Sequence, residues 1–368
     1  MITLWRLTLV LACAGGAHVG AAAVDLYVAP DGADANPGNA TAPFRTIARA
    51  AAAARPGTTI HVAPGTYREN VKTSAHGRAT ARVRFVSDTR WGARVIGRGK
   101  EAAWTNHGDF TDIADFDVSG SGRLGIVNYA SHTTISGNHV HDLAVSGGCT
   151  GSGGAGIDNA NYRGSDGDII GNVVHDIGVP GGCNGVHGIY SSNLRGRIYN
   201  NIVYRASAWG IHLWHAANNV TIANNTVFAN GAAAVGGGIL FGAGDGPAGA
   251  VLNHTRVINN IVYNNPAASI KEFCYPGQDC TGRNNIIANN LVFGNGDAIS
   301  LRAGAAAGTI AADPQFVNYQ ADGSGDYRLK GSSPAIDKGA TTFAPVTDID
   351  NASRQRGAAP DLGAYENY

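Results

Sequence analysis

Short runs of alternating apolar and polar residues recur along this chain, each broken in the middle by Gly-Asn or Asn-Asn. Six such units are visible: TISGNHVHD (134–142), DIIGNVVHD (168–176), GRIYNNIVY (196–204), VTIANNTVF (220–228), TRVINNIVY (255–263) and NIIANNLVF (285–293). Alternation with a period of two predicts β-strands with one buried face. Each unit therefore predicts a pair of short strands joined by a tight turn.

Asparagines at equivalent positions set the spacing of the units. They are Asn138, Asn172, Asn201, Asn225, Asn260 and Asn290. Their separations run from 24 residues (Asn201 to Asn225) to 35 residues (Asn225 to Asn260), a range typical of solenoid coils with loops of varying length. Asparagine tolerates left-handed backbone and bonds to neighbouring backbone groups, so we expect these side chains to stack at a turn and satisfy buried polar groups.

A further strand recurs in the same units, as GIVNY (125–129), GIDNA (156–160), GIYSS (188–192), GIHLW (210–214), GILFG (238–242), SIKEF (269–273) and AISLR (298–302). If each isoleucine points into the core, the residue after it points outward. Stacking then predicts an outward column of Val127, Asp158, Tyr190, His212, Leu240, Lys271 and Ser300, about 4.8 Å apart. A second column holds Tyr129, Ala160, Ser192, Trp214, Gly242, Phe273 and Arg302. Both columns assume that no bulge shifts the register.

The charge composition argues against one class of protein. The 368 residues carry 27 basic and 27 acidic side chains, only 15% are charged, and 52 are glycine. A nucleic-acid-binding protein normally shows a strong basic excess, so no nucleic-acid partner is expected. The basic run between Arg68 and Lys100 alternates with apolar residues, which favours a solvated strand face over an anion site.

The first 23 residues have the features of a secretory signal. They contain one positive charge, a short apolar core and an Ala-Ala-Ala sequence that ends at Ala23. Cleavage there leaves a mature chain that begins near Val24; a lipoprotein-type site at Cys13 is the alternative. No later apolar run approaches the roughly 20 residues that a membrane span requires. A secreted or periplasmic protein without a membrane partner is therefore expected.

Export makes disulfides plausible for the four remaining cysteines. Cys274 and Cys280 bracket a Pro-Gly turn, which favours a local pair. Cys149 and Cys183 each follow a Gly-Gly and lie eleven residues after equivalent asparagines, so we expect them to lie in neighbouring coils. Zinc binding is disfavoured because the C-x-x-C spacing of a zinc site is absent.

Both ends of the chain resemble a known class of proteins. The segment DLYVAPDGADANPGNATAPFRTIARAAAAARPGTTIHVAPGTYREN resembles the N-terminal part of pectate and alginate lyase relatives, and the segments DYRLKGSSPAID and TDIDNASRQRGAAPDLGAYE are similar to the C-terminal part of many bacterial β-helix proteins. The resemblance implies an all-β, right-handed parallel β-helix over residues 24–368. It places an N-terminal cap with a short alanine helix and the first strand at 24–60, the clearest coils at 110–302 and a C-terminal extension at 310–368. It also implies a bacterial enzyme acting on an acidic polysaccharide, although this scaffold carries several chemistries.

The densest chemistry lies in WGIHLWH, residues 209–215. Cleavage of a uronate polymer by β-elimination requires a base, an acid and a group that stabilises negative charge. The candidate catalytic residues are His212 as base, Tyr190 as acid or alternative base, Lys271 as cation, and His187. Strict alternation would bury His187, which precedes an inward isoleucine by two positions. The candidate substrate-binding residues are Trp214, His215, Arg302, Arg163, Arg195 and Asp158.

No cofactor is expected. The chain lacks the Asp-Asp pair typical of calcium-dependent pectate lyases and the Asp-Pro-His sequence of alginate epimerases. Calcium binding through Asp112, Asp115 and Asp117 is the alternative. His139, His141 and His175 precede or lie near acidic turn residues, which favours structural hydrogen bonding.

Two other functions stay open. A glycoside hydrolase needs two carboxylates across its groove, and Asp158 with Glu272 fits poorly because Glu272 is expected to point inward. A glycan-binding protein without catalysis is the other alternative, in which the aromatic side chains bind sugar and nothing is cleaved. Coil-to-coil packing is the competing interpretation for Trp209 and Phe273. We expect a monomer in each case.

Overall fold

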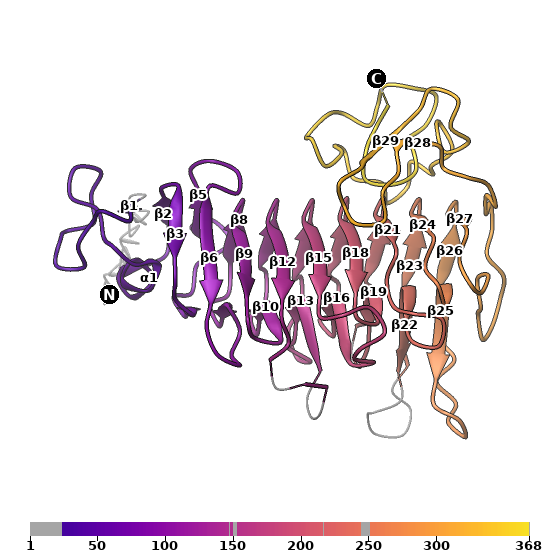
Figure 1. Cartoon of the computed structure of the whole chain (residues 1–368), viewed down its shortest axis with the longest axis horizontal. Helices are drawn as coiled ribbons and strands as arrows, with labels where there is room; N and C mark the ends of the chain where they lie inside the picture. Colours follow the sequence, from indigo (N-terminus) through magenta and orange to yellow (C-terminus); the bar gives the residue numbers. More distant parts are fainter. Residues whose placement is uncertain (1–23, 147, 150–152, 216, 244–250, 368) are drawn as a thin grey trace, which may run out of the picture.

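The computed structural model describes residues 24–367 except 147, 150–152, 216 and 244–250. The predicted signal segment, residues 1–23, therefore lies outside the described residues. Each of the eight coils between Thr58 and Cys274 contributes one strand to each of three sheets, which we number 1 to 3. All strand pairs within these sheets are parallel, and the coils follow one another along the long axis of the molecule (Figure 1). The chain is thus an all-β parallel β-helix, as predicted.

Sheet 1 has ten strands: β1 (Val24–Val28), β2 (Thr58–Val62), β5 (Val83–Ser87), β8 (Thr111–Ala114), β11 (Thr134–Ser136), β14 (Asp168–Ile170), β17 (Arg197–Tyr199), β20 (Thr221–Ala223), β23 (Arg256–Ile258) and β26 (Ile286–Ala288). Sheet 2 has nine: β3 (Gly65–Tyr67), β6 (Ala93–Gly97), β9 (Asp117–Gly120), β12 (His139–Leu143), β15 (Val173–Ile177), β18 (Ile202–Ala206), β21 (Thr226–Phe228), β24 (Ile261–Tyr263) and β27 (Leu291–Phe293). Sheet 3 has eight: β4 (Val71–Thr73), β7 (Trp104–Asn106), β10 (Leu124–Asn128), β13 (Gly154–Asn159), β16 (Val186–Ser191), β19 (Trp209–Leu213), β22 (Gly237–Ala243) and β25 (Ala268–Cys274).

The predicted asparagine stack forms the turn between sheets 1 and 2. Asn138, Asn172, Asn201, Asn225, Asn260 and Asn290 are fully buried. From Asn172 onward, each Oδ1 accepts both the backbone N–H and the side-chain amide of the preceding ladder asparagine, at 2.9–3.1 Å. The residue before each ladder asparagine has a positive φ, as in Gly137 at 66° and Asn200 at 57°. This explains the Gly-Asn and Asn-Asn pairs, because glycine and asparagine tolerate left-handed backbone best.

Both ends of the solenoid carry additional structure. The short helix α1 (Ile47–Ala53) lies beside the first strands at the N-terminal end (Figure 1). The hydroxyl of Thr46 caps it by accepting the N–H of Arg49, and it ends before Pro56-Gly57. At the other end, the antiparallel pair β28 (Phe316–Asn318) and β29 (Asp326–Leu329) folds back onto the outer side of sheet 2. An apolar cluster there joins Tyr204 and Phe228 to Tyr327.

Both predicted disulfides are present, Cys149–Cys183 and Cys274–Cys280. In the part of the chain that the structure describes, no helix has the length and apolarity needed to cross a membrane.

Candidate functional site

Sheet 3 forms the floor of a groove of about 1010 Å³. The strand register pairs Val127 with Asp158, Asp158 with Tyr190, Tyr190 with His212, His212 with Leu240, Leu240 with Lys271, and Lys271 with Ser300. The first predicted outward column is therefore confirmed position by position. Asp158, Tyr190, His212, Leu240 and Lys271 all line the groove.

A backbone irregularity brings His187 into the groove. A Cβ atom on Gly188 would lie 2.4 Å from Cγ1 of Val203, a core residue, so Gly188 faces the interior as does the isoleucine after it. The register skips the same glycine. Because two consecutive residues face inward, the preceding His187 faces out. The expectation that strict alternation buries His187 in the core is wrong: this side chain is buried, at 4% exposure, but it lines the groove.

Hydrogen bonds determine which ring nitrogen carries the hydrogen in His187 and in His212. The backbone N–H of Trp209 donates to Nδ1 of His187 at 3.3 Å, so Nε2 of a neutral His187 carries the hydrogen. That Nε2 lies 2.8 Å from Nδ1 of His212 and donates to it. The hydrogen of His212 then resides on Nε2, which is buried and has no partner among the described residues. His212 thus presents an N–H donor, where the sequence analysis expected a base.

Both imidazoles are neutral in this environment. Burial lowers the pKa of His187 to about 3. The pKa of His212 lies well below its ordinary value because of burial and the neighbouring His187 and His215. A neutral His212 acts as a donor without a positive charge.

Asp158 and His212 lie on opposite sides of Tyr190, on the two neighbouring strands. Burial raises its pKa to about 7, and its Oδ1 has no hydrogen-bond partner among the described residues. At neutral pH this carboxyl group is therefore close to half ionised, which is the condition in which a group exchanges protons most readily.

Aromatic rings cover the part of the groove near β25. Trp214 packs between His212, Phe273 and Tyr275 at ring-centre distances of 5.4–5.9 Å. Only 5% of Trp214 is exposed, whereas 40% of Tyr275 is exposed. The surface available for stacking on a sugar belongs more to Tyr275 than to Trp214. Lys271 lies beside these rings, with Nζ 5.8 Å above Phe273.

Two further predicted residues line the groove floor and edge. The ring of His215 lies 4.3 Å from the ring of Tyr162, and both contribute to the lining. Trp209 lines the groove too, although only 7% of it is exposed.

The three predicted arginines do not line the groove. Arg195 forms an ion pair with Asp166, with Nη2 2.9 Å from Oδ2, and Arg163 lies exposed in a loop. The N–H of Arg302 donates to Glu272, whose side chain is buried as expected. Among the described lining residues, Lys271 is the one lysine or arginine.

Two carboxylates line the groove, but they lie far apart. Asp297, which the sequence analysis missed because it lies in a loop without a pattern, is bridged to Ala268. Asp158 is five strand steps from it, roughly 24 Å at about 4.8 Å per step. Glycosidase carboxylates lie about 5–9.5 Å apart, so the described lining residues do not supply such a pair.

The alternative calcium ligands do not converge. Asp112 belongs to β8 in sheet 1 and pairs with Arg82, with 2.9 Å between Nε and Oδ1. Asp117 belongs to β9 in sheet 2 and bonds to two histidines. Asp112 and Asp117 are therefore directed to different surroundings.

Comparisons with known proteins agree with this fold. Residues 30–79 match a family of proteins of unknown function, DUF1565, and no curated protein matches the chain. Among solved structures, the chain is similar to pectate lyase Pel9A (20% identity, 94% of this chain and 96% of that chain, TM-score 0.64). It is also similar to a rhamnogalacturonan lyase (15%, 84% and 96%, TM-score 0.54) and to an alginate lyase from Paenibacillus sp. str. FPU-7 (16%, 72% and 96%, TM-score 0.48). The similarity to pectate lyase Pel9A shows a right-handed parallel β-helix, which confirms the predicted fold.

Proposed function

We propose that this protein is a secreted polysaccharide lyase that cleaves a uronate-containing glycan by β-elimination in the groove of sheet 3. The observation that carries the proposal is the sequence of Asp158, Tyr190 and His212 on three adjacent strands of the groove floor. Two of these side chains hold buried polar atoms that have no partner in the part of the chain that the structure describes. Such atoms are costly unless a ligand pairs with them.

Each residue has a role in this proposal. Asp158, with its raised pKa, takes the proton next to the uronate carboxylate. The Nε2–H group of His212 donates a hydrogen bond to the negative charge that develops there, after a small ring movement uncovers it. Tyr190, between them, gives a proton to the leaving glycosidic oxygen while a carbon–carbon double bond forms in the sugar. Lys271 binds a uronate carboxylate along the groove.

The similar structures support the glycan class of substrate, since two of them are named as pectate lyase and rhamnogalacturonan lyase. The distance between Asp158 and Asp297 disfavours a two-carboxylate hydrolase. Secretion is supported by the predicted signal segment and by the two disulfides.

The deciding experiment incubates the purified mature protein with a panel of uronate polysaccharides, with and without a calcium chelator. Absorbance of unsaturated products and new reducing ends are followed together. If both rise, elimination is established, and activity that survives the chelator supports a scheme without calcium. Reducing ends without absorbance mean hydrolysis and contradict the proposal. Retention of polysaccharide without either signal means a binding protein and contradicts it as well.

A further inference from the structure

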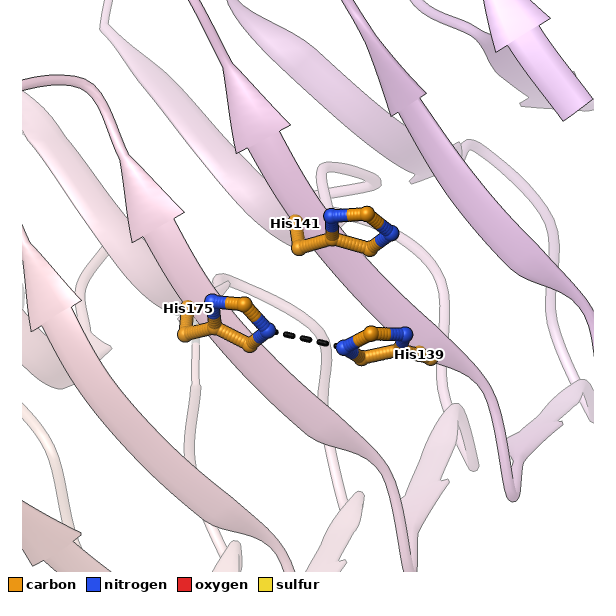
Figure 2. A group of neighbouring side chains, drawn as sticks. All are labelled: His139, His141 and His175. Carbon is orange, nitrogen blue, oxygen red and sulfur yellow. Dashed lines mark hydrogen bonds between the residues drawn. The ribbon is translucent and has the colours of Figure 1, made fainter. Parts of the chain in front are cut away.

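The outer face of sheet 2 carries a second cluster of histidines, away from the groove. His139 and His141 both point outward from β12, and His175 lies on the adjacent strand β15 in register with His141. One ring nitrogen of each histidine lies within 4.8 Å of the others. Figure 2 shows the three rings together, with His139 and His175 directed toward each other.

Each of the three rings is held by a carboxylate through the same nitrogen. The Nδ1 contacts are His139 to Asp117 at 2.9 Å, His141 to Asp142 at 2.8 Å and His175 to Asp176 at 2.7 Å. An ionised carboxylate only accepts, so each Nδ1 carries a hydrogen, and the neutral rings of His139 and His175 keep a lone pair on Nε2. His141 also contacts Asp117 through Nε2 and donates from both nitrogens, so its Nε2 becomes a ligand only when it gives up that hydrogen. Histidines that bind metals are held in this way by outer carboxylates.

The two facing nitrogens need a cation between them. Nε2 of His139 lies 2.7 Å from Nε2 of His175. Because both Nδ1 atoms donate to carboxylates, two neutral rings would direct lone pairs at each other. A shared proton or a metal ion relieves that repulsion.

We propose that this cluster binds a divalent transition-metal ion of the Zn²⁺, Ni²⁺ and Cu²⁺ class, through His139, His175 and His141. Imidazole ligands favour these ions, whereas Ca²⁺ and Mg²⁺ require oxygen ligands. A tetrahedral zinc ion with bonds of about 2.0–2.1 Å holds two nitrogens roughly 3.3 Å apart. A small rotation of His139 or His175 provides this separation.

The surroundings suit an ion that enters from solvent. The side chains of the three histidines are 14–21% exposed. The ring of Trp91 packs against His139 at a tilt, with 4.8 Å between the ring centres, and the ring of Tyr204 stacks on His175 at 4.6 Å. These contacts hold the rings of His139 and His175 in place. His141 Nε2, now 3.0 Å from Asp117 Oδ2, exchanges that bond for the ion.

A bound ion would connect neighbouring coils. It ties β12 to β15 directly, and Asp117 links it to β9. The ion therefore stabilises the folded chain by an amount that grows with the concentration of free metal.

The test uses tag-free mature protein, freed of metal by a chelator and then dialysed. Calorimetric titration with ZnCl₂ is expected to give one ion per chain and a rise in Tm. His139→Gln and His175→Gln are each expected to weaken binding at least about tenfold and to abolish the Tm rise. With Cu²⁺, electron paramagnetic resonance is expected to show coupling to nitrogen nuclei.

Two control variants locate the site. His61→Gln removes a histidine on sheet 1 that is also paired with an aspartate, and His212→Gln removes a groove histidine; both are expected to keep the affinity of the unmodified chain. Absence of a stoichiometric zinc ion, or unchanged affinity in His175→Gln, overturns the proposal in favour of a shared proton. Since these readouts involve no polysaccharide, they are independent of the proposed lyase activity.

Discussion

Nδ1 of His212 lies 2.8 Å from Nε2 of His187, and the two rings stand at 90° to each other. This contact, together with the Trp209 N–H bond to His187, leaves His212 with its hydrogen on Nε2. His187 is therefore a positioning residue for the donor in the proposed reaction.

Replacing His187 by phenylalanine removes the donor that fixes the tautomer of His212. We expect kcat to fall by about tenfold to a hundredfold with little change in KM, because losing a preorganised donor completely costs roughly 10²–10³. His187→Gln, which keeps an N–H donor, is expected to recover part of the loss. Nitrogen NMR shifts of His212 report the tautomer directly, and a His187→Phe variant with the kcat of the unmodified chain would contradict this role.

Tyr190→Phe removes the proposed proton donor and keeps the ring. Proton transfer by a positioned side chain contributes about 10²–10⁴ to rate, so a loss of that size is expected in the absorbance assay. Tyr199→Phe, on sheet 1, is the matched control and should retain activity. Equal activity of the two variants would exclude Tyr190 as the acid.

The pH dependence of cleavage reports on Asp158. With a pKa of about 7, the carboxylate is the active form of the base. We expect kcat/KM to rise about tenfold per pH unit below 7 and to level off above it. Asp158→Asn is expected to abolish this activity. A profile that falls between pH 5 and pH 8 would assign the base to another group.

Asp158 also makes stability depend on pH. Its pKa in the folded chain lies above the ordinary value of about 3.9, so the folded state is favoured at low pH and loses that advantage as pH rises from 4 through 7. Asparagine stays neutral throughout. Asp158→Asn is therefore expected to be more stable than the unmodified chain at pH 8, by about 1–3 kcal/mol, and similar at pH 4. Denaturant unfolding at the two pH values measures this, and a difference of the opposite sign would contradict it.

Asn225 lies in the middle of the buried ladder. Its Oδ1 accepts two bonds from Asn201, and its amide donates to Asn260. Asn225→Ala leaves several buried groups unpaired, and we expect it to lower the free energy of unfolding by about 3–5 kcal/mol. A second ladder joins Asn230, Asn265 and Asn295, in which the Oδ1 of Asn265 and that of Asn295 each accept from the asparagine before them. Asn295→Ala, at the half-buried end of this second ladder, is expected to cost about 1–2 kcal/mol. A similar loss of unfolding free energy in both variants would show that burial within the ladder does not determine this cost.

Periodic features of the sequence predicted much of this structure. Alternation and the spacing of asparagines gave the coils, the Asn ladder and the column that runs from Asp158 to Lys271. The Cys149–Cys183 disulfide followed from the positions of these cysteines relative to the same repeat, and the Cys274–Cys280 disulfide followed from the Pro-Gly turn between them. These predictions succeeded because each depends on a local rule, which for all but the Cys274–Cys280 pair recurs from coil to coil.

The errors arose where contacts depend on more than the repeat. The inward Gly188 before Ile189 shifts His187 into the groove, and the recurrence of Gly-Ile in five of the seven units was the available signal. Arg195 was expected at the substrate, but Asp166 from the neighbouring loop neutralises it. The hydrogen bonds of His141 to Asp142 and of His175 to Asp176 agree with the sequence analysis. The contact between His139 and His175 depends on which ring nitrogens meet, which residue spacing alone does not supply.

The varying length of the coils has an evolutionary consequence. Ladder asparagines separated by 24 or by 35 residues stack with the same hydrogen bonds. Additional residues in a coil are therefore accommodated in its loops, and the strands are not disturbed. The floor of the groove and its walls are therefore free to diversify separately. For the proposed lyase activity, a new polymer specificity can arise by lengthening a loop while the residues proposed to transfer protons stay in place.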